Sequence, residues 1–307
     1  FKSADGGQTW QNISEGLPKP MEDEYAAGSN VFFADDNGLW LTAGNGIYHS
    51  KPNATAPFWS KEVFPDEHSS IAPGKAGIYA YNYGGEGIFQ KTNGKEVWSP
   101  VFTNFAEKQI FSIFETAGGT VFIGSDRGLF KSSNSGKSWK QLPVGGGGKM
   151  VASNGVLLAT SESGIVRSTD DGENWALVIS EGGVGIDVAS INGGFAAIAY
   201  SAQTKSRRIS ISLDNGKTWQ AIDEGLRPSL SISSIKQMGK YLICGHPDGI
   251  FQSSDMGKTW KNVYPSVDKK EFKFVPTLND SFSEPVKVFR IHVSGDVLYA
   301  VAGSDGC

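Results

Sequence analysis

The stretch Ser253-Ser254-Asp255-Met256-Gly257-Lys258-Thr259-Trp260 decides the fold, because the chain repeats it from end to end. Two of the copies vary the pattern, one with Asn at the seventh position, the other with Asn for Asp and Ser for Thr. The copies lie at residues 3–10, 132–139, 168–175 and 212–219, with eroded versions at 50–59 and 92–98. Repetition at intervals of about 40 residues is typical of an array of similar supersecondary units.

Each copy has the composition of a tight turn between two strands. The Asp or Asn at the third position can accept hydrogen bonds from backbone N–H groups one to three residues on, closing an Asx-type turn. The Gly at the fifth position reaches positive φ, as hairpin loops with a bulge require. The final Trp begins the outgoing strand and offers a large apolar face for burial between neighbouring sheets. The residues expected to be structural are therefore Asp5, Trp10, Asn134, Trp139, Asp170, Trp175, Asp214, Trp219, Asp255 and Trp260.

Acidic turns of this kind have calcium binding as an alternative role. A calcium loop of the Asp-x-Asp-x-Gly type needs a Glu further on and additional oxygen ligands. In every copy here, Trp occupies the place after the turn. We therefore expect no metal site, and the absence of a phosphate-cradling Gly loop leads us to expect no cofactor.

The pattern Ser/Thr-x-Asp-x-Gly-x-Thr-Trp resembles the Asp-box repeat, also called the BNR repeat. That repeat is found in sialidases, sortilin-like receptor domains, xyloglucan-cleaving hydrolases and photosystem II assembly-factor propellers. The resemblance implies a β-propeller in which each box joins the third and fourth strands of a blade, on the face away from the usual pocket. It also implies export, so that the protein would be secreted, periplasmic or at the cell surface. Because these families have unrelated activities, the resemblance does not select a function.

The number of blades follows from the tryptophans that close the units, which are spaced 36 to 49 residues apart. They are Trp10, Trp59, Trp98, Trp139, Trp175, Trp219 and Trp260. This spacing suits four short strands per unit. We predict an all-β protein, a seven-bladed β-propeller of four-stranded antiparallel blades in one domain that spans residues 1–307.

The two ends of the chain complete one blade between them. Residues 297–307 align with residues 241–250, and the Phe-x-Ser and turn that should follow are found as Phe1-Lys2-Ser3. The predicted shared blade takes its first two strands from residues 286–307 and its last two from residues 1–14. Such joining removes free sheet edges. The second unit, residues 25–62, has the most degenerate turn and is the least certain to form a full blade.

Composition narrows the classes of partner. The formal net charge is −4 and the isoelectric point is near 5.7, without the basic stripe that nucleic-acid binding requires. No apolar run approaches the roughly 20 residues that span a bilayer. Two cysteines, Cys244 and Cys307, are too few for a disulfide framework and lack metal-ligand spacing. We expect a monomer without nucleic-acid partners or a membrane span.

The face opposite the turns is the predicted ligand-binding face. It carries the loops between second and third strands and the connections from one blade to the next. Acidic, basic and aromatic residues there would suit a polar ligand such as a glycan or a peptide. The predicted face comprises Tyr83, Glu86, Asp126, Arg127, Glu162, Arg208, Arg227, His246, Asp248 and Asp305.

Two hypotheses of function remain open. The preferred one is a non-catalytic binding or assembly propeller that recognises a glycan or a protein on this face, because no catalytic constellation is recognisable. The alternative is a secreted glycoside hydrolase, sialidase-like or xyloglucan-hydrolase-like, which needs two carboxylates roughly 5–10 Å apart. Weak candidates for these carboxylates are Asp126, Glu162 and Asp248.

A sialidase is disfavoured within that alternative. Phe289-Arg290-Ile291-His292 matches three of the four residues of the sialidase Phe-Arg-Ile-Pro element, but packing alone accounts for Phe and Ile there. The chain has only six arginines from which to build an arginine triad. The family resemblance also implies six blades for a sialidase, whereas this chain predicts seven.

Overall fold

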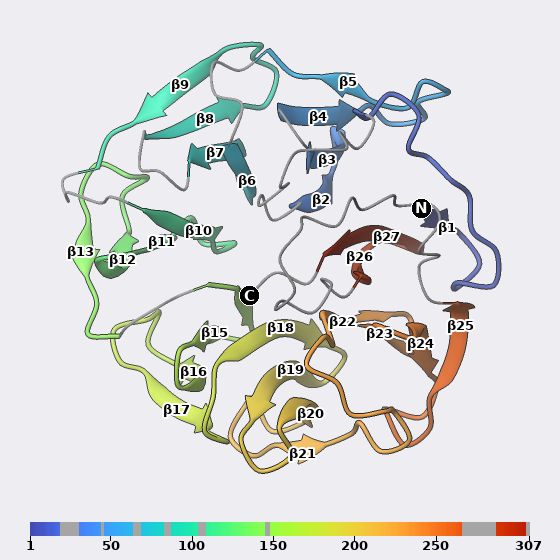
Figure 1. The fold of residues 1–307 in the computed structure, drawn as a ribbon. Helices are drawn as coiled ribbons and strands as arrows, with labels where there is room; N and C mark the ends of the chain where they lie inside the picture. The colour runs from blue at the N-terminus through green and yellow to red at the C-terminus, as the bar shows by residue number, and fades with distance from the viewer. Residues whose placement is uncertain are drawn as a thin grey trace, which may run out of the picture. The chain divides into compact units, whose positions relative to one another are not determined.

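The computed structural model describes residues 1–18, 31–43, 46–63, 69–82, 87–103, 109–144, 148–265 and 287–304. Its regular structure consists of strands in seven antiparallel sheets, which confirms the predicted all-β, seven-bladed β-propeller (Figure 1). Over the described residues there is no helix that is long and apolar enough to cross a membrane. The chain divides into two compact units, residues 1–63 with 224–307 and residues 64–223. A single domain over residues 1–307 stays a prediction.

The first unit holds three sheets. One sheet has the order β2-β3-β4-β5, a second has β22-β23-β24-β25, and the third has β1-β27-β26. The strand bounds are β1 (Lys2–Ser3), β2 (Phe32–Asp35), β3 (Gly38–Ala43), β4 (Gly46–Ser50), β5 (Ser60–Lys61), β22 (Ser234–Met238), β23 (Tyr241–His246), β24 (Gly249–Ser253), β25 (Lys261–Pro265), β26 (Lys287–Ser294) and β27 (Val297–Ser304).

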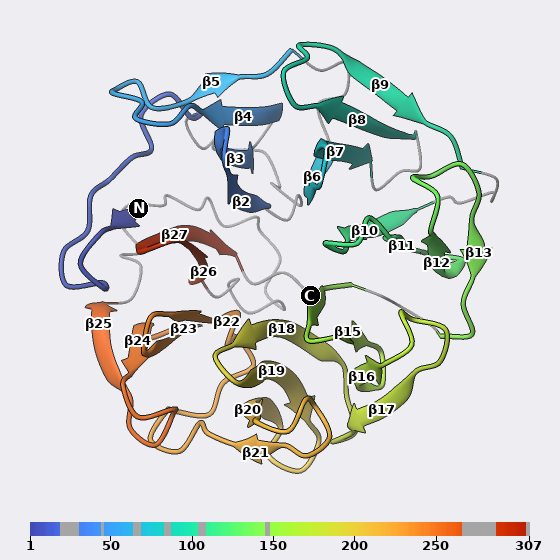
Figure 2. The same ribbon diagram turned by 180° about the vertical axis from the view of Figure 1, so that it is seen from behind.

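The third sheet of this unit is the predicted blade shared by both ends of the chain. β1 pairs with β27, with Lys2 opposite Tyr299 and Ser3 opposite Leu298, and the two strands lie side by side in Figures 1 and 2. The fourth strand is reduced to a single bridge between Lys2 and Gln11. Cys307, which was expected beside the N-terminus, lies outside the described residues.

The second sequence repeat, predicted at residues 25–62, forms a full blade, β2-β3-β4-β5, in spite of its degenerate turn. β4 pairs with β5 across the loop that replaces the motif. Trp59 is buried at the end of this loop, and its indole Nε1 donates to the Ile13 carbonyl at 2.6 Å. A contact with residues 46 positions earlier therefore anchors a Trp that has lost its own turn.

The compact unit of residues 64–223 holds four sheets, which follow one another in chain order in Figure 1. Each of the four has its strands in sequence order. The strand bounds are β6 (Ser69–Gly74), β7 (Gly77–Asn82), β8 (Ile88–Thr92), β9 (Trp98–Val101), β10 (Ile110–Glu115), β11 (Val121–Ser125), β12 (Gly128–Ser132), β13 (Lys140–Gln141), β14 (Met150–Ser153), β15 (Val156–Ser161), β16 (Gly164–Ser168), β17 (Ala176–Ile179), β18 (Gly185–Ile191), β19 (Gly194–Ser201), β20 (Ser206–Ser212) and β21 (Gln220–Ala221).

Apolar side chains fill the spaces between neighbouring sheets of this unit. One cluster joins β14–β17 to β18–β21 through buried residues such as Leu158 and Phe195, and Trp219 packs against it. Trp139 and Trp175 pack in the same way against the clusters on the side of their preceding blades. The motif tryptophans thus contribute to packing between blades, as predicted, although Trp139, Trp175 and Trp219 are half-buried.

The repeated turns are closed by their own side chains. Asp214 Oδ1 accepts hydrogen bonds from the Ser212 hydroxyl at 2.7 Å, from Lys217 N at 3.1 Å and from Thr218 N at 2.9 Å. The Thr218 hydroxyl donates to the other carboxylate oxygen, and Ser212 Oγ accepts from Gly216 N at 2.8 Å. The backbone donors to the Asp therefore lie three and four residues on, so one falls within the expected range of one to three and the other lies one residue beyond it. An i+4 donor closes a wider loop than an Asx turn.

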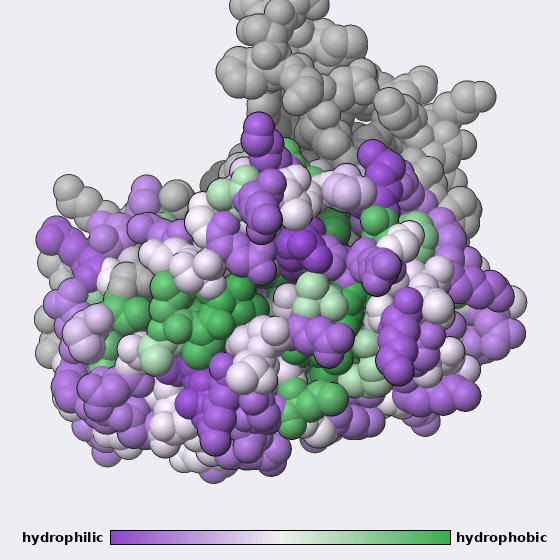
Figure 3. All heavy atoms as spheres, turned by 90° about the horizontal axis from the view of Figure 1, so that it is seen from below, coloured by the Kyte–Doolittle hydropathy of each residue, from purple (hydrophilic) through white to green (hydrophobic). Residues whose placement is uncertain are grey.

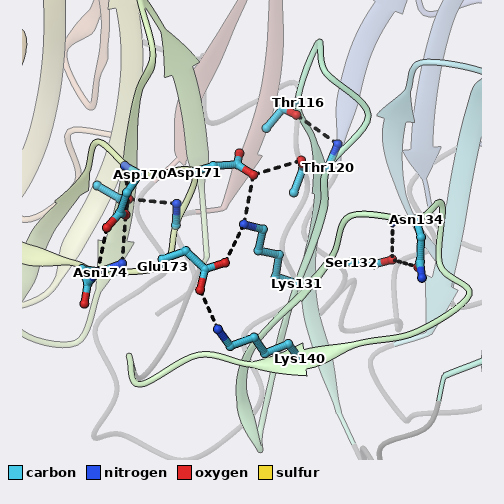
Figure 4. Close-up of polar contacts among 12 residues, drawn as sticks. Thr116, Thr120, Lys131, Ser132, Asn134, Lys140, Asp170, Asp171, Glu173 and Asn174 are labelled. Atoms are coloured by element: carbon cyan, nitrogen blue, oxygen red, sulfur yellow. Dashed lines mark hydrogen bonds and ion pairs between the residues drawn. The ribbon is translucent and has the colours of Figure 1, made fainter.

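Side chains also link three of the turns to the preceding blade. In β12 the ammonium of Lys131 lies 3.0 Å from Asp171 Oδ2 and 2.9 Å from Glu173 Oε1, which belong to the next turn (Figure 4). Lys140 contacts the second oxygen of Glu173, and the Thr120 hydroxyl donates to Asp171. Two cations and two carboxylates thus balance each other where these blades meet, and Lys131 is buried among them.

The position of Lys131, directly before the motif Ser, has the same role in two other blades. Arg167 Nε donates to the Asn215 carbonyl at 2.7 Å, and Gln252 Nε2 donates to the Gly6 carbonyl at 2.8 Å. In each case the partner is the residue that follows the Asp of the next turn. A long polar residue before the motif therefore extends the repeat into a contact between blades.

Most of the visible surface in Figure 3 is hydrophilic, with hydrophobic residues gathered in patches. Among the described residues, the exposed large apolar side chains include Phe102 and Leu213. Phe102 and Leu213 lie in different blades, and single exposed apolar residues such as these are normal for folded proteins. The surface alone therefore does not mark a binding site, and the candidate site rests on polar geometry.

Candidate functional site

Three of the predicted face residues come together in the first unit. Asp248 lies between β23 and β24, His246 ends β23, and Arg227 lies in the connection that leads to β22. Arg227 Nε donates to Asp248 Oδ2 at 2.8 Å and Nη2 donates to Oδ1 at 2.6 Å. This bidentate geometry is the strongest that a guanidinium and a carboxylate form. We call Arg227, His246 and Asp248 the Arg227 site.

The His246 imidazole fixes the backbone of the other two residues of the Arg227 site. Its Nδ1 accepts a hydrogen bond from Asp248 N at 3.0 Å, so its Nε2 carries the proton and donates to the Arg227 carbonyl at 2.9 Å. The ring is 1% exposed and lies edge-on to Phe251. Burial lowers the pKa of His246 below its ordinary value, which favours this neutral form.

The Arg227–Asp248 pair itself is open to solvent. The side chains are 62% and 42% exposed, respectively. Hydrogen bonds from Arg227 lower the pKa of Asp248, so the carboxylate is ionised at neutral pH. Asn262 Nδ2 donates to the Asp248 carbonyl at 3.0 Å and holds the loop from β25. The site is therefore an exposed ion pair on a backbone that His246 and Asn262 hold in place.

The acidic residues of the second unit lie in short turns between second and third strands. Asp126 Oδ1 accepts a hydrogen bond from Gln109 N at 3.0 Å, which ties the turn to the start of β10. Arg127 is exposed, and its carbonyl accepts from Gln141 Nε2 at 2.6 Å. Glu162 is exposed in the turn between β15 and β16. Asp126 and Arg127 thus form one local cluster, whereas Glu162 belongs to another blade.

Arg208 was expected in a loop, and this prediction is wrong. β19 ends at Ser201 and β20 begins at Ser206, so the excursion is short and Arg208 is a strand residue. Its guanidinium binds both oxygens of Asp223, at 2.6 and 2.9 Å. The strand continues because its residues pair in register with β19, including Arg208 with Ala199. Three further predicted residues, Tyr83, Glu86 and Asp305, lie outside the described residues.

One buried carboxylate, that of Asp187, was not predicted from the sequence. Asp187 in β18 is 1% exposed, and Lys149 Nζ lies 3.2 Å from its Oδ1. Lys149 precedes β14, and its backbone N–H donates to Thr160 Oγ1 at 2.9 Å. The only signal in the sequence was an Asp within a mostly apolar strand. A buried acid that has a cation beside it is a structural ion pair in the first instance.

Metal binding has no candidate cluster in the part of the chain that the structure describes. No group of three or more His, Cys, Asp and Glu side chains there is arranged to hold an ion. The Asp at the third position of the motif directs its oxygens at donors of its own turn, as Asp5 does with Ser3, Gln8 and Thr9. Cys244 is buried in β23, and Cys307 lies outside the described residues.

The solved structures to which this chain is similar are β-propellers. The GH74 xyloglucanase from Xanthomonas campestris has a TM-score of 0.63 at 14% identity, over 84% of this chain and 49% of its own. A catalytically inactive virginiamycin B lyase from Staphylococcus aureus, solved with quinupristin, has a TM-score of 0.62 at 12% identity, over 89% of this chain and 92% of its own. The extracellular domain of a protein assigned to a hybrid two-component system of B. thetaiotaomicron has a TM-score of 0.60 at 12% identity, over 95% of this chain and 41% of its own.

These similarities define a class of fold and nothing finer. The chain spans about two fifths of the length of an ancestral GH74 enzyme and of the B. thetaiotaomicron domain that it matches. Known protein families gave no match, and neither did the curated proteins. The fold and the site together define a seven-bladed β-propeller that carries an exposed, preorganised ion pair between two of its loops.

Proposed function

We propose that the protein is a non-catalytic recognition module that binds a glycan or protein ligand at the face carrying the Arg227 site. On this proposal the repeated turns are Asp-box turns that hold the blades, and the protein is secreted, periplasmic or displayed at a cell surface. The observation that carries the proposal is the state of Asp248. Arg227 binds both oxygens of this carboxylate and lowers its pKa.

At its general acid, a glycoside hydrolase would need the opposite arrangement, whereas its second carboxylate works in the ionised form. The general acid of a glycosidase must hold a proton near neutral pH, and its environment must therefore raise its pKa. Asp248 is driven towards ionisation, and Asp126 uses an oxygen to hold Gln109 N. Two of the three candidate carboxylates thus have local structural partners, which supports binding rather than hydrolysis.

The exposed pair is well suited to polar recognition. A guanidinium carries five N–H donors, of which the bidentate contact with Asp248 uses two. The remaining donors and the outer lone pairs of Asp248 face solvent, where hydroxyl or amide groups of a ligand can reach them. Because His246 and Asn262 hold the backbone, little conformational entropy is lost when these groups bind.

The test is binding of the labelled protein to glycan and peptide arrays, followed by titration of the best ligand. Arg227→Ala should weaken binding by at least about tenfold, the usual range for loss of a buried or bidentate charged contact. Lys258→Ala is the matched control, because it removes the same charge from an exposed position of the turn between β24 and β25. Equal affinities of the two variants, or no ligand on either array, would contradict the proposal.

A further inference from the structure

In three blades, the turn between the second and third strands is closed by a side chain that accepts a backbone hydrogen bond. This residue is a serine in two of the blades and a histidine in the third. Ser125 Oγ accepts a hydrogen bond from the backbone N–H two residues on, at 3.1 Å, and Ser161 Oγ does so at 3.3 Å. His246 occupies the same position, and its Nδ1 accepts from Asp248 N at 3.0 Å. A histidine thus replaces a serine as the acceptor that closes the turn.

The replacement adds two properties that serine lacks. Through Nε2 the imidazole also reaches the Arg227 carbonyl, so one side chain holds both partners of the ion pair. In addition, imidazole titrates in the mildly acidic range, whereas a serine hydroxyl does not. The contacts at Nδ1 require the neutral form, since Nδ1 can accept a hydrogen bond only when it carries no proton.

A proton on Nδ1 would change the Arg227 site in a defined way. It would face the N–H of Asp248, and two donors cannot share a hydrogen bond. The nearest charged acceptor is Asp248 Oδ2, which lies 3.5 Å from Nδ1. That oxygen is the one that now accepts from Arg227 Nε at 2.8 Å. The protonated imidazole and Arg227 would therefore compete for the same oxygen.

We propose that His246 makes the Arg227 site acid-responsive: when its ring takes a proton from solvent, it draws Asp248 away from Arg227, and the released guanidinium binds an oxyanion of the ligand. The oxyanion is a carboxylate or a sulfate group, since both match the guanidinium fork. This inference rests on the proposed function, whose ligand site it specifies.

Two charged groups act on the imidazole from the elements around it. Asp248, in the turn that follows His246, favours protonation of the ring. Arg227, in the connection between β21 and β22, opposes it. Burial opposes it most strongly, so the pKa of His246 lies below the ordinary value of 6.5. The switch therefore operates in acidic solution, and at neutral pH the bidentate pair stays closed.

NMR on the whole chain tests the switch without a ligand. We expect the His246 ring and the Arg227 Nε–H signals to titrate together as the pH falls from 7.5 to 5. In His246→Ser, which copies Ser125 and Ser161, the turn should remain closed and the Arg227 signal should stay constant. An Arg227 signal that ignores the titration of His246, or an imidazole that stays neutral down to pH 5, would overturn the inference.

Trigalacturonate and sodium sulfate serve as anionic probes, and galactotriose serves as the neutral probe. Between pH 7.5 and 5.5 we expect the affinity of wild type for an anionic probe to rise at least fivefold, and that of His246→Ser to stay constant. Asp248→Asn should bind the anion at both pH values, because its guanidinium is always released. Failure of wild type to bind either anion at pH 5.5 would overturn the inference.

The outcomes separate this inference from the proposed function. A neutral glycan or a peptide that binds with equal affinity at both pH values, and is lost in Arg227→Ala, would leave the recognition module standing and remove the switch. Loss of all binding in every variant and at every pH would remove both.

Discussion

Met256 is the least suited residue for its place in the repeated turns. The residue between the Asp and the Gly has positive φ, and at Met256 this angle is 58°. The left-handed region costs an L-residue with a long side chain about 1–2 kcal/mol, and Asn tolerates it best after Gly. Asn215 fills the same position at a φ of 61°.

Met256→Asn should therefore stabilise the protein. We expect the free energy of unfolding to rise by about 0.5–1 kcal/mol, because the strain at this φ is relieved. Urea denaturation of the variant and of Lys258→Ala, an exposed change in the same turn, provides the measurement. A lower denaturation midpoint for Met256→Asn would show that the thioether makes a contact worth more than the strain.

His246 predicts a pH dependence of stability. Because its pKa is lowered in the folded state, the unfolded chain takes up a proton first, near its ordinary value of 6.5. Stability is therefore complete above pH 6.5 and falls as the pH drops towards the folded-state pKa. His246→Ser should remove this decline, which denaturation at pH 7.5, 6.5 and 5.5 would show. An unchanged slope would mean that other groups cause it.

At the scale of the element, the turn and its Trp stabilise the contact between blades. Trp219 packs against the cluster that joins β14–β17 to β18–β21, and its Nε1 donates to the Gly216 carbonyl at 3.2 Å. Full truncation of a core aromatic costs about 3–5 kcal/mol. Because Trp219 is only half-buried, we expect Trp219→Ala to cost about 2–3 kcal/mol in thermal or urea unfolding.

Leu213→Ala is the control for this change, since Leu213 lies in the same turn and is 62% exposed. It should leave the midpoint of unfolding within experimental error. Equal effects of the two substitutions would contradict a specific packing role for the Trp.

The turns also predict acid sensitivity. Hydrogen bonds from Thr259 lower the pKa of Asp255 from 3.8 to about 2. The stability that depends on the ionised form is present above about pH 4 and is lost as the pH falls through 2. In Asp255→Asn the turn should close as it does at Asn134, whose amide donates to the Ser138 hydroxyl and accepts from Ser138 N.

We therefore expect Asp255→Asn to reduce the slope of unfolding free energy between pH 4 and 2 by up to one proton. Urea denaturation across this range measures it. An unaltered slope, with the fold intact at pH 7, would show that the carboxylate does not titrate with folding.

The sequence predicts elements far better than sites, and the motif explains why. Each turn marks one blade, so the seven tryptophans that close the units give the number of sheets. Even the shared blade follows from the alignment of the two ends. The donor three residues after the Asp was predicted, but the donor four residues after it was not, because residue types do not distinguish an i+2 donor from an i+4 donor. The links from Lys131, Arg167 and Gln252 to the next turn repeat as well, but their residue types differ and no common pattern points to them.

At the scale of the whole molecule, the Arg227 site could be predicted only in part. The presence of Arg227, His246 and Asp248 on one face follows from their places relative to the repeat. The repeat does not predict that His246 bridges Arg227 and Asp248, because the connection carrying Arg227 has no periodic pattern that fixes its conformation. The pair of Lys149 and Asp187 was missed for a different reason, because the two residues belong to different blades and no sequence pattern relates them.

The central claim is that this face binds without catalysing. The most direct test is to incubate the purified protein with a broad panel of chromogenic glycosides and with xyloglucan, and to measure product release beside binding to the same glycans. We predict no turnover above buffer. Turnover that disappears in Asp126→Asn, Glu162→Gln or Asp248→Asn would contradict the claim and identify a glycoside hydrolase.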